Sequence, residues 1–184
     1  MVNDDITLRP AQPDDADRAA VLLYSAYLHR QVSYPLHEEG ENRFLERLQH
    51  YFRQEGNRFS YQFIQVAEQR CEVVGLVLSF GGREEERLNA AVGWPLEREA
   101  EEDEWYVDAL AVFTNWGCKG IGTRLLQAAE QQARHYRYPK IALNVAPENA
   151  QALSLYQRLQ YVVTRETFLY HHPYVRLVKR LENG

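Results

Sequence analysis

Hydrophobic and polar positions along this 184-residue chain follow two periods, one typical of helices and the other typical of strands. Where apolar side chains recur every three or four residues, with charged residues between them, the pattern predicts an amphipathic helix. Helices are expected over residues 13–30, 41–54, 120–136 and 148–159. Runs of β-branched and aromatic residues predict strands over residues 6–9, 61–66, 73–80, 105–113, 140–145, 161–169 and 174–181.

The order of these expected elements indicates the fold class. Strands 61–66 and 73–80 flank a short polar stretch and are expected to pair as an antiparallel hairpin. Helices alternate with strands in only part of the chain, so a mixed α/β sheet covered by helices on both faces fits better than a fully parallel sheet. Residues from about 81 to 104 are rich in acids, and we interpret them as a loop inserted into a single domain that spans 1–184.

Composition and charge exclude several classes of function. The chain is 45% hydrophobic and 26% charged, as in an ordinary globular protein, and its formal net charge is −5. No general attraction to nucleic acid or to anionic lipid is therefore expected. The chain starts with acidic rather than basic residues, and no apolar run approaches the ~18 residues of a membrane span, which favours a cytoplasmic location.

The cysteines and histidines do not predict a metal site. Cys71 and Cys118 lie far apart in the chain, and neither has a histidine or a second cysteine at the spacing of metal ligands. The pair His171-His172 has no carboxylate next to it and is interpreted as part of a surface turn. We expect no metal and no disulfide scaffold.

A glycine-containing turn is the stretch with the most evident chemical potential. It reads Gly117-Cys118-Lys119-Gly120-Ile121-Gly122-Thr123 and joins the expected strand 105–113 to the expected helix 120–136. Glycine lets the backbone approach a bulky anion, and the free amides of a helix's first turn favour a phosphate or diphosphate. The spacing is neither that of dinucleotide-binding folds nor that of the phosphate loop of NTPases. Taken alone, the turn fits a packing role as well as a binding role.

Two motifs, in the order found here, resemble the acetyl-CoA-binding core of the GCN5-related N-acetyltransferase (GNAT) superfamily. In the first, residues 105–112 lead into 117–126, similar to the family's strand and Gln/Arg-x-x-Gly-x-Gly/Ala loop. In the second, residues 149–156 followed by 160–161 are similar to Asn-x-x-Ala-x-x-Leu-Tyr-x-x-x-Gly-Phe. The chain departs from these patterns at Gly117, where Gln or Arg is usual, and at Gln160, where Gly is usual.

The resemblance implies a mixed, mostly antiparallel sheet of about seven strands, in which parallel strands 105–113 and 140–145 splay apart to hold acyl-CoA. It implies transfer of an acetyl group from acetyl-CoA to a primary amine, on a small molecule or a peptide, by direct attack. It also makes a homodimer an expectation, because homodimers are frequent in the family. The residues implied in cofactor binding are Leu110, Ala111, Val112, Gly117, Cys118, Lys119, Gly120, Ile121, Gly122, Thr123, Asn149 and Tyr156.

Tyr156 is the leading catalytic candidate, because it matches the tyrosine that donates a proton to the CoA thiolate in many family members. For the general base, the sequence leaves Asp108 and Glu104 open. Asp108 interrupts an apolar strand and is expected to share a face with Tyr106 and Leu110, whereas Glu104 lies at the start of that strand. Each candidate also has a structural reading: core packing for the tyrosine, a buried hydrogen bond for Asp108 and a solvated charge for Glu104.

Two further alternatives stay open at this point. Asn149 is either a helix cap or a cofactor ligand, and both roles are compatible. The chain itself is either an acetyltransferase or a catalytically silent acyl-CoA-binding module of the same fold. The acid-rich segment before residue 105 could attract a cationic acceptor, although acidic loops are more often only solvated.

Overall fold

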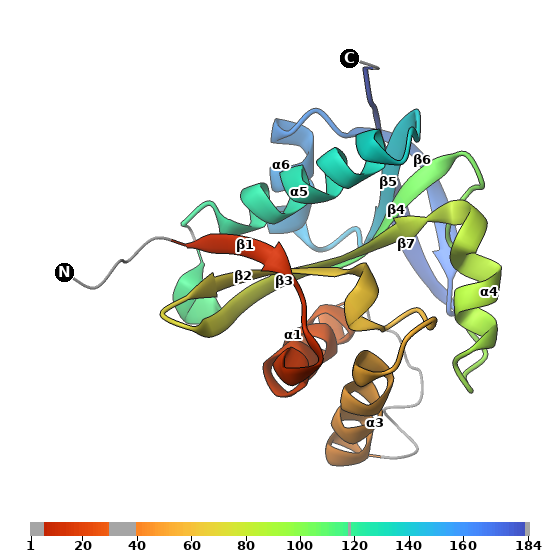
Figure 1. Cartoon of the computed structure of the whole chain (residues 1–184). Helices are drawn as coiled ribbons and strands as arrows, with labels where there is room; N and C mark the ends of the chain where they lie inside the picture. The colour runs from red at the N-terminus through yellow and green to blue at the C-terminus, as the bar shows by residue number, and fades with distance from the viewer. Residues whose placement is uncertain (1–5, 30–39, 118, 183–184) are drawn as a thin grey trace.

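The computed structural model describes residues 6–29, 40–117 and 119–182, and a seven-stranded sheet runs through its centre (Figure 1). The strand order is β1-β2-β3-β4-β5-β7-β6, and every neighbouring pair is antiparallel except β4 and β5, which are parallel. The mixed, mostly antiparallel fold class is confirmed. The strands are β1 (Thr7–Pro10), β2 (Ile64–Gln69), β3 (Glu72–Gly81), β4 (Glu104–Val112), β5 (Lys140–Val145), β6 (Val162–Leu169) and β7 (His172–Arg180).

Helices cover both faces of this sheet. Helices α1 (Ala16–His29) and α3 (Glu41–Arg53) lie on one face, and α5 (Ile121–His135) and α6 (Ala150–Arg158) lie on the other (Figure 1). Each face buries its own apolar cluster, one built around α1 and α3 and the other around α5. None of the helices in the described ranges combines the length and the apolar character that a bilayer crossing requires.

The predicted and observed elements differ mainly at their ends. The strand expected from residue 61 begins at Ile64, because residues Tyr61–Phe63 form a 3-10 turn. Ser60 starts that turn, and its hydroxyl accepts a hydrogen bond from the amide of Gln62 at 3.2 Å. Such a side-chain cap offers the backbone an alternative to the strand, which apolar patterning does not reveal.

A bulge in β4 changes which side chains of this strand lie on the same face of the sheet. In the pairing with β3, Leu78 lies opposite Ala109 and Ser79 lies opposite Val107, so Asp108 is an extra residue with no partner position. An extra residue shifts the alternation of the side chains by one position. Leu110 therefore packs in the α5 cluster, whereas Asp108 contacts α1 on the other face, and the expectation that both share one face is wrong.

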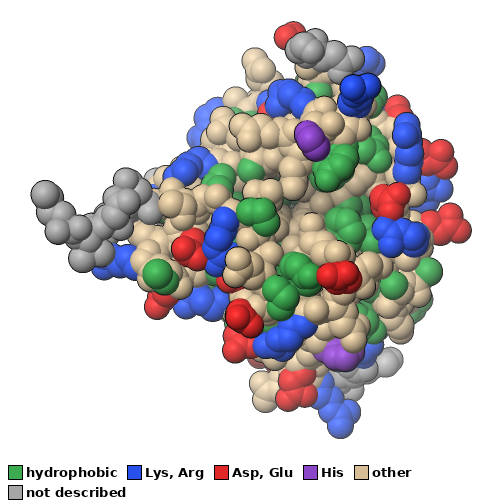
Figure 2. Space-filling view, in the orientation of Figure 1, with side chains coloured by type: hydrophobic (Ala, Val, Ile, Leu, Met, Phe, Trp, Pro, Cys, Tyr) green, Lys and Arg blue, Asp and Glu red, His purple; other side chains and the backbone are tan. Residues whose placement is uncertain are grey.

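Most acids of the segment 84–104 pair with basic side chains within the fold, and the helix of this segment is α4 (Glu85–Ala90). Buried Glu85, Glu99 and Glu104 contact arginines. Four more exposed acids also have basic neighbours: Glu84, Glu101, Glu102 and Asp103. On the face drawn in Figure 2, acidic and basic side chains are interspersed. This pairing weakens the expectation that the segment attracts a cationic acceptor. The basic partners are Arg58, Arg87, Arg98, Lys140, Arg165 and Arg176.

The pairing of Glu101 predicts an acid-dependent loss of stability. Hydrogen bonds from Lys140 (2.7 Å) and Arg165 (3.0 Å) lower the pKa of Glu101 to about 2. A carboxylate with a lowered pKa stabilises the fold at neutral pH, and this contribution is lost as pH falls from the ordinary pKa of 4.5 toward 2.

We expect the difference in free energy of unfolding between wild type and Glu101→Gln to shrink over that pH range. Urea denaturation at a series of pH values measures it, with Glu102→Gln, 3.5 Å from exposed Arg98, as the control. A difference that stays constant down to pH 2 would contradict the assignment.

Candidate functional site

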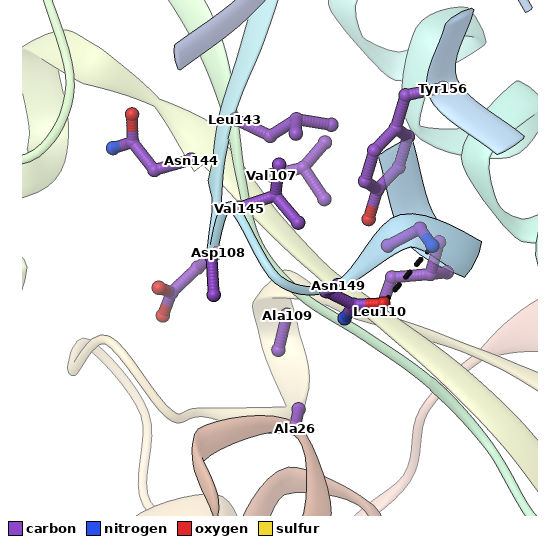
Figure 3. A pocket seen from close by; sticks show the side chains of 12 residues that line it. Ala26, Val107, Asp108, Ala109, Leu110, Leu143, Asn144, Val145, Asn149 and Tyr156 are labelled. Atoms are coloured by element: carbon purple, nitrogen blue, oxygen red, sulfur yellow. Dashed lines mark hydrogen bonds between the residues drawn. The ribbon is translucent and has the colours of Figure 1, made fainter. Parts of the chain in front are cut away.

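The parallel strands β4 and β5 part shortly after they begin. Their register pairs Glu104 with Lys140, Trp105 with Ile141 and Tyr106 with Ala142, and ends there. The bulge at Asp108 lies just beyond the last pair, where a bulge bends its strand. A pocket lies between the parted strands, and its lining residues are Ala26, Val107, Asp108, Ala109, Leu110, Leu143, Asn144, Val145, Ala146, Asn149, Ala152 and Tyr156 (Figure 3).

The two sides of this pocket carry different polar groups. Tyr156 extends from α6 with its hydroxyl toward the pocket, next to the apolar side chains of Val107 and Leu143 (Figure 3). Asp108 and Asn144 project to the other side of β5, away from Tyr156 (Figure 3). The structure thus brings Tyr156 and Asp108 to one pocket, but on opposite faces of the sheet.

The glycine turn forms the start of α5. Gly120 is its N-cap residue and has φ of +75°, a left-handed conformation that favours glycine. A helix leaves its first amides without partners inside the helix, and glycine has no side chain to cap them. A Cβ at Gly122 would lie 3.7 Å from Leu155, so this helix end lies beside α6, which also carries Tyr156. The start of α5 therefore presents its first-turn amides beside the helix that carries Tyr156.

The other residues of the turn have local partners. Gly117 ends a 3-10 turn and donates its amide hydrogen to the carbonyl of Thr114 at 3.1 Å. The Lys119 ammonium lies 4.3 Å from the centre of the Trp116 ring. Cys118 lies outside the described residues. Whether these residues contact a cofactor stays a prediction.

Asn149 lies where both of the roles suggested by the sequence, a helix cap and a cofactor ligand, are possible. Its side-chain oxygen accepts a hydrogen bond from the amide of Ala152 at 3.1 Å, so it caps α6. It also lines the pocket, where Figure 3 shows it below Tyr156. The cap is observed, and the contact with a cofactor stays a prediction.

Asp108 is held by a buried arginine. Its carboxylate accepts hydrogen bonds from Arg58 Nε (2.9 Å) and Nη2 (2.8 Å) and from the Tyr27 hydroxyl (2.8 Å). Arg58 also donates to Glu99 at 2.7 Å and lies 3.4 Å from Glu85. Burial alone would lower the pKa of Arg58, but Asp108 and Glu99 raise it well above its ordinary value. The guanidinium is therefore charged, and it faces several carboxylates.

Glu104 lies outside the pocket. Its side chain is fully buried at the end of β4 that is still paired with β5, and Oε1 accepts hydrogen bonds from Arg176 and from the amide of Glu101. Oε2 has no hydrogen-bond partner and lies 4.0 Å from Lys140 Nζ. The structure thus separates Glu104 from Tyr156 and Asp108, which do line the pocket.

Arg58 and Asn144 are residues of the site that the sequence analysis did not identify. An acid within an apolar strand signals that a partner exists, because burying a lone charge is costly. Arg58, however, lies 50 positions away from Asp108 in an irregular segment with no periodic pattern. Among the described residues, no group of three or more His, Cys, Asp or Glu side chains is arranged to hold a metal ion.

Comparisons with known proteins agree with this geometry. A model of the Acetyltransferase (GNAT) family matches residues 23–161. An N-acetyltransferase from Staphylococcus aureus Mu50 superimposes with a TM-score of 0.81 at 27% identity, covering 94% of this chain and all of that one. A search of curated proteins found no match.

Two more distant structures share the fold and contain the coenzyme. YncA of Salmonella typhimurium, a putative acetyltransferase solved with acetyl-CoA, has a TM-score of 0.66 at 16% identity, covering 97% of this chain and 95% of that one. The PaiA N-acetyltransferase of Thermoplasma acidophilum, solved with coenzyme A, has a TM-score of 0.60 at 12% identity, covering 96% and 99%. At these identities the likeness shows the fold alone.

Proposed function

Because the chain belongs to the GNAT acetyltransferase family, we propose that it transfers an acetyl group from acetyl-CoA to a primary amine by direct attack of the amine. The supporting observation is the pocket between the parted strands, with Tyr156 on one face of the sheet and Asn144 on the other. An opening between two strands lets two ligands meet at one point from opposite faces. Such an arrangement orients the reactants, which is a large part of catalysis of a two-substrate reaction.

The residues on the α5 face fit an acyl-CoA. The first-turn amides of Ile121, Gly122 and Thr123 would hold its diphosphate, and the open space beside Gly120 lets a bulky anion approach. The β4 edge at Leu110, Ala111 and Val112, which β5 leaves unpaired, would receive the pantetheine arm as an added strand. Gly117, Cys118, Lys119 and Asn149 would border this path. When bound, acetyl-CoA supplies a thioester as the activated acetyl donor.

Tyr156 is the group placed to act on the leaving sulfur. A phenolic hydroxyl can donate a proton, and the Tyr156 hydroxyl points into the pocket from the face that α5 and α6 cover (Figure 3). The amine would reach the pocket from the other face, where Ala26, Asp108 and Asn144 lie. We propose that Tyr156 protonates the departing thiolate as the C–S bond breaks, and that the attacking nitrogen, having formed the C–N bond, releases one proton to solvent.

Titration calorimetry with Gly120→Val tests the binding half of this proposal. Valine in a left-handed conformation is strained by about 1–2 kcal/mol and would displace the first amides of α5, so we expect acetyl-CoA affinity to fall about tenfold. Gly40→Val is the matched control, since Gly40 has φ of +79° and starts α3 on the other face. Valine is strained there at least as much as at Gly120, because Gly40 has ψ of 157° and Gly120 has ψ of 8°, but acetyl-CoA affinity should not change.

Release of free thiol from acetyl-CoA, measured over a panel of primary amines, tests the catalytic half. Absence of acetyl-CoA binding at millimolar concentration would overturn the proposal as a whole. Binding without turnover on any amine would favour the silent acyl-CoA-binding module instead.

A further inference from the structure

Asp108 is the residue at which β4 turns away from β5. It is the extra residue of the bulge, two positions after Tyr106, which makes the last pair with β5. A bulge leaves its extra residue without a partner in the ladder and bends the strand. The direction of that bend depends on what holds the extra side chain.

The Asp108 carboxylate is held by groups from two other parts of the fold. Arg58, from the irregular segment before β2, donates through Nε and Nη2, and Tyr27 of α1 donates its hydroxyl. Two parallel hydrogen bonds from one planar guanidinium fix direction as well as distance. The Asp108 side chain has no exposed surface, so bulk water does not compete with these donors.

The far side of Arg58 is anchored as well. Nη2 donates to Glu99 at 2.7 Å, and Nη1 donates to Asn89 of α4 at 3.0 Å. The guanidinium also lies 5.4 Å from the centre of the Phe80 ring of β3. Asp108 is therefore tied, through Arg58, to α4, to β3 and to the loop that leads into β4.

The hydrogen bonds that Asp108 accepts from Arg58 argue against Asp108 as a general base. A carboxylate that accepts two hydrogen bonds from a charged guanidinium is stabilised as the anion, and protonation would weaken both bonds. It would also leave Arg58 buried with less compensation for its charge, which is costly.

We infer that Asp108 is a positioning residue: held by Arg58 and Tyr27, it fixes the bulge of β4 and with it the opening between β4 and β5 into which the acyl-CoA thioester fits. This inference rests on the proposed function, since it explains how the fold keeps that opening. It assigns Arg58 and Tyr27 to the same task and removes Asp108 from the proton-transfer step.

Tyr27→Phe is the first test, because it removes one donor and keeps the ring that packs on Phe59. We expect the KM and Kd for acetyl-CoA to rise about tenfold, with the inflection of the kcat–pH curve unchanged. A general base that lost this donor would show its inflection at higher pH, with the KM unchanged. Tyr61→Phe, which removes a hydroxyl bound to exposed Glu55, is the matched control and should behave as wild type.

Asp108→Asn is the second test. We expect kcat/KM to fall about 10- to 100-fold, mostly through KM, with the wild-type pH dependence retained in the remaining activity. A fall in kcat of more than about 1,000-fold at unchanged KM would identify Asp108 as the base and overturn the inference.

Amide hydrogen exchange gives a readout that needs no ligand. Exchange at residues 107–110 of β4 should be faster in Tyr27→Phe than in wild type and unchanged in Tyr61→Phe. Unchanged exchange in Tyr27→Phe, with unchanged acetyl-CoA affinity, would overturn the inference. Failure of the proposed function would be seen separately, as absence of acetyl-CoA binding or of turnover in the wild type.

Discussion

Tyr156→Phe is expected to lower kcat about 100- to 1,000-fold while acetyl-CoA affinity stays within about twofold of wild type. The change removes the hydroxyl that points into the pocket and retains the ring, which lies 5.9 Å from that of Tyr161. Without a proton donor, the thiolate must leave as an anion in a site that is largely apolar. Thiol release measures kcat, and titration calorimetry measures the affinity.

Tyr161→Phe is the matched control for this prediction. Its hydroxyl contacts Glu130 at 3.1 Å, and Tyr161 does not line the pocket. The variant therefore loses a buried hydrogen bond and some stability but should retain kcat. Wild-type kcat in Tyr156→Phe, or an equal loss in the two variants, would remove Tyr156 from the proton-transfer step.

Gly82→Ala is expected to lower the free energy of unfolding by more than about 3 kcal/mol. Gly82 follows β3 and lies against the loop that leads into β4. A Cβ at this position would overlap the carbonyl oxygen of Glu101 and lie 3.2 Å from that of Glu104. Both obstacles are backbone atoms, which cannot move away as a flexible side chain can. Urea denaturation measures the change.

Gly93→Ala is the control for the effect of adding a methyl group. Its Cβ would meet only the Tyr51 hydroxyl, at 3.5 Å, which is ordinary contact. We expect its free energy of unfolding to stay within about 0.5 kcal/mol of wild type. Similar values for the two alanine variants would show that the loop at Glu101 can move, and would contradict the close packing of Gly82.

Periodicity predicted the elements that bury one face. Strand β5 has the expected bounds, and α5 and α6 lie within two residues of theirs. The elements that differ are those in which a local hydrogen bond competes with the pattern, such as the 3-10 turn after Ser60. The bulge at Asp108 was missed for another reason: β4 is largely buried on both faces, so its apolar residues do not alternate with polar ones and a shift in alternation leaves no mark.

The residues of the candidate site also fall into two groups, those that could be identified from the sequence and those that could not. Gly120, Asn149 and Tyr156 could be identified from the sequence, because each belongs to a short motif whose residues act within one turn or one helix. Arg58 and Asn144 could not, because Arg58 belongs to the site only through its contact with the distant Asp108, and Asn144 comes to the pocket only when β5 lies beside β4. Glu104 and Asp108, the two candidate bases, lie four positions apart in β4 and are bound to different arginines. Asp108 lines the opening, whereas Glu104 lies where β4 is still paired with β5.

The linear pattern of this chain was sufficient for the seven strands, for the helices on both faces and for the glycine and tyrosine motifs, since these depend on neighbours along the backbone. The bulge at Asp108, the face to which its side chain points and the partners of the acid-rich segment came only from the folded chain. The orientation of Asp108 and the burial of Glu99 depend on Arg58, which is tens of residues away, and the free energy of such pairs is set by position in space rather than by order in the sequence.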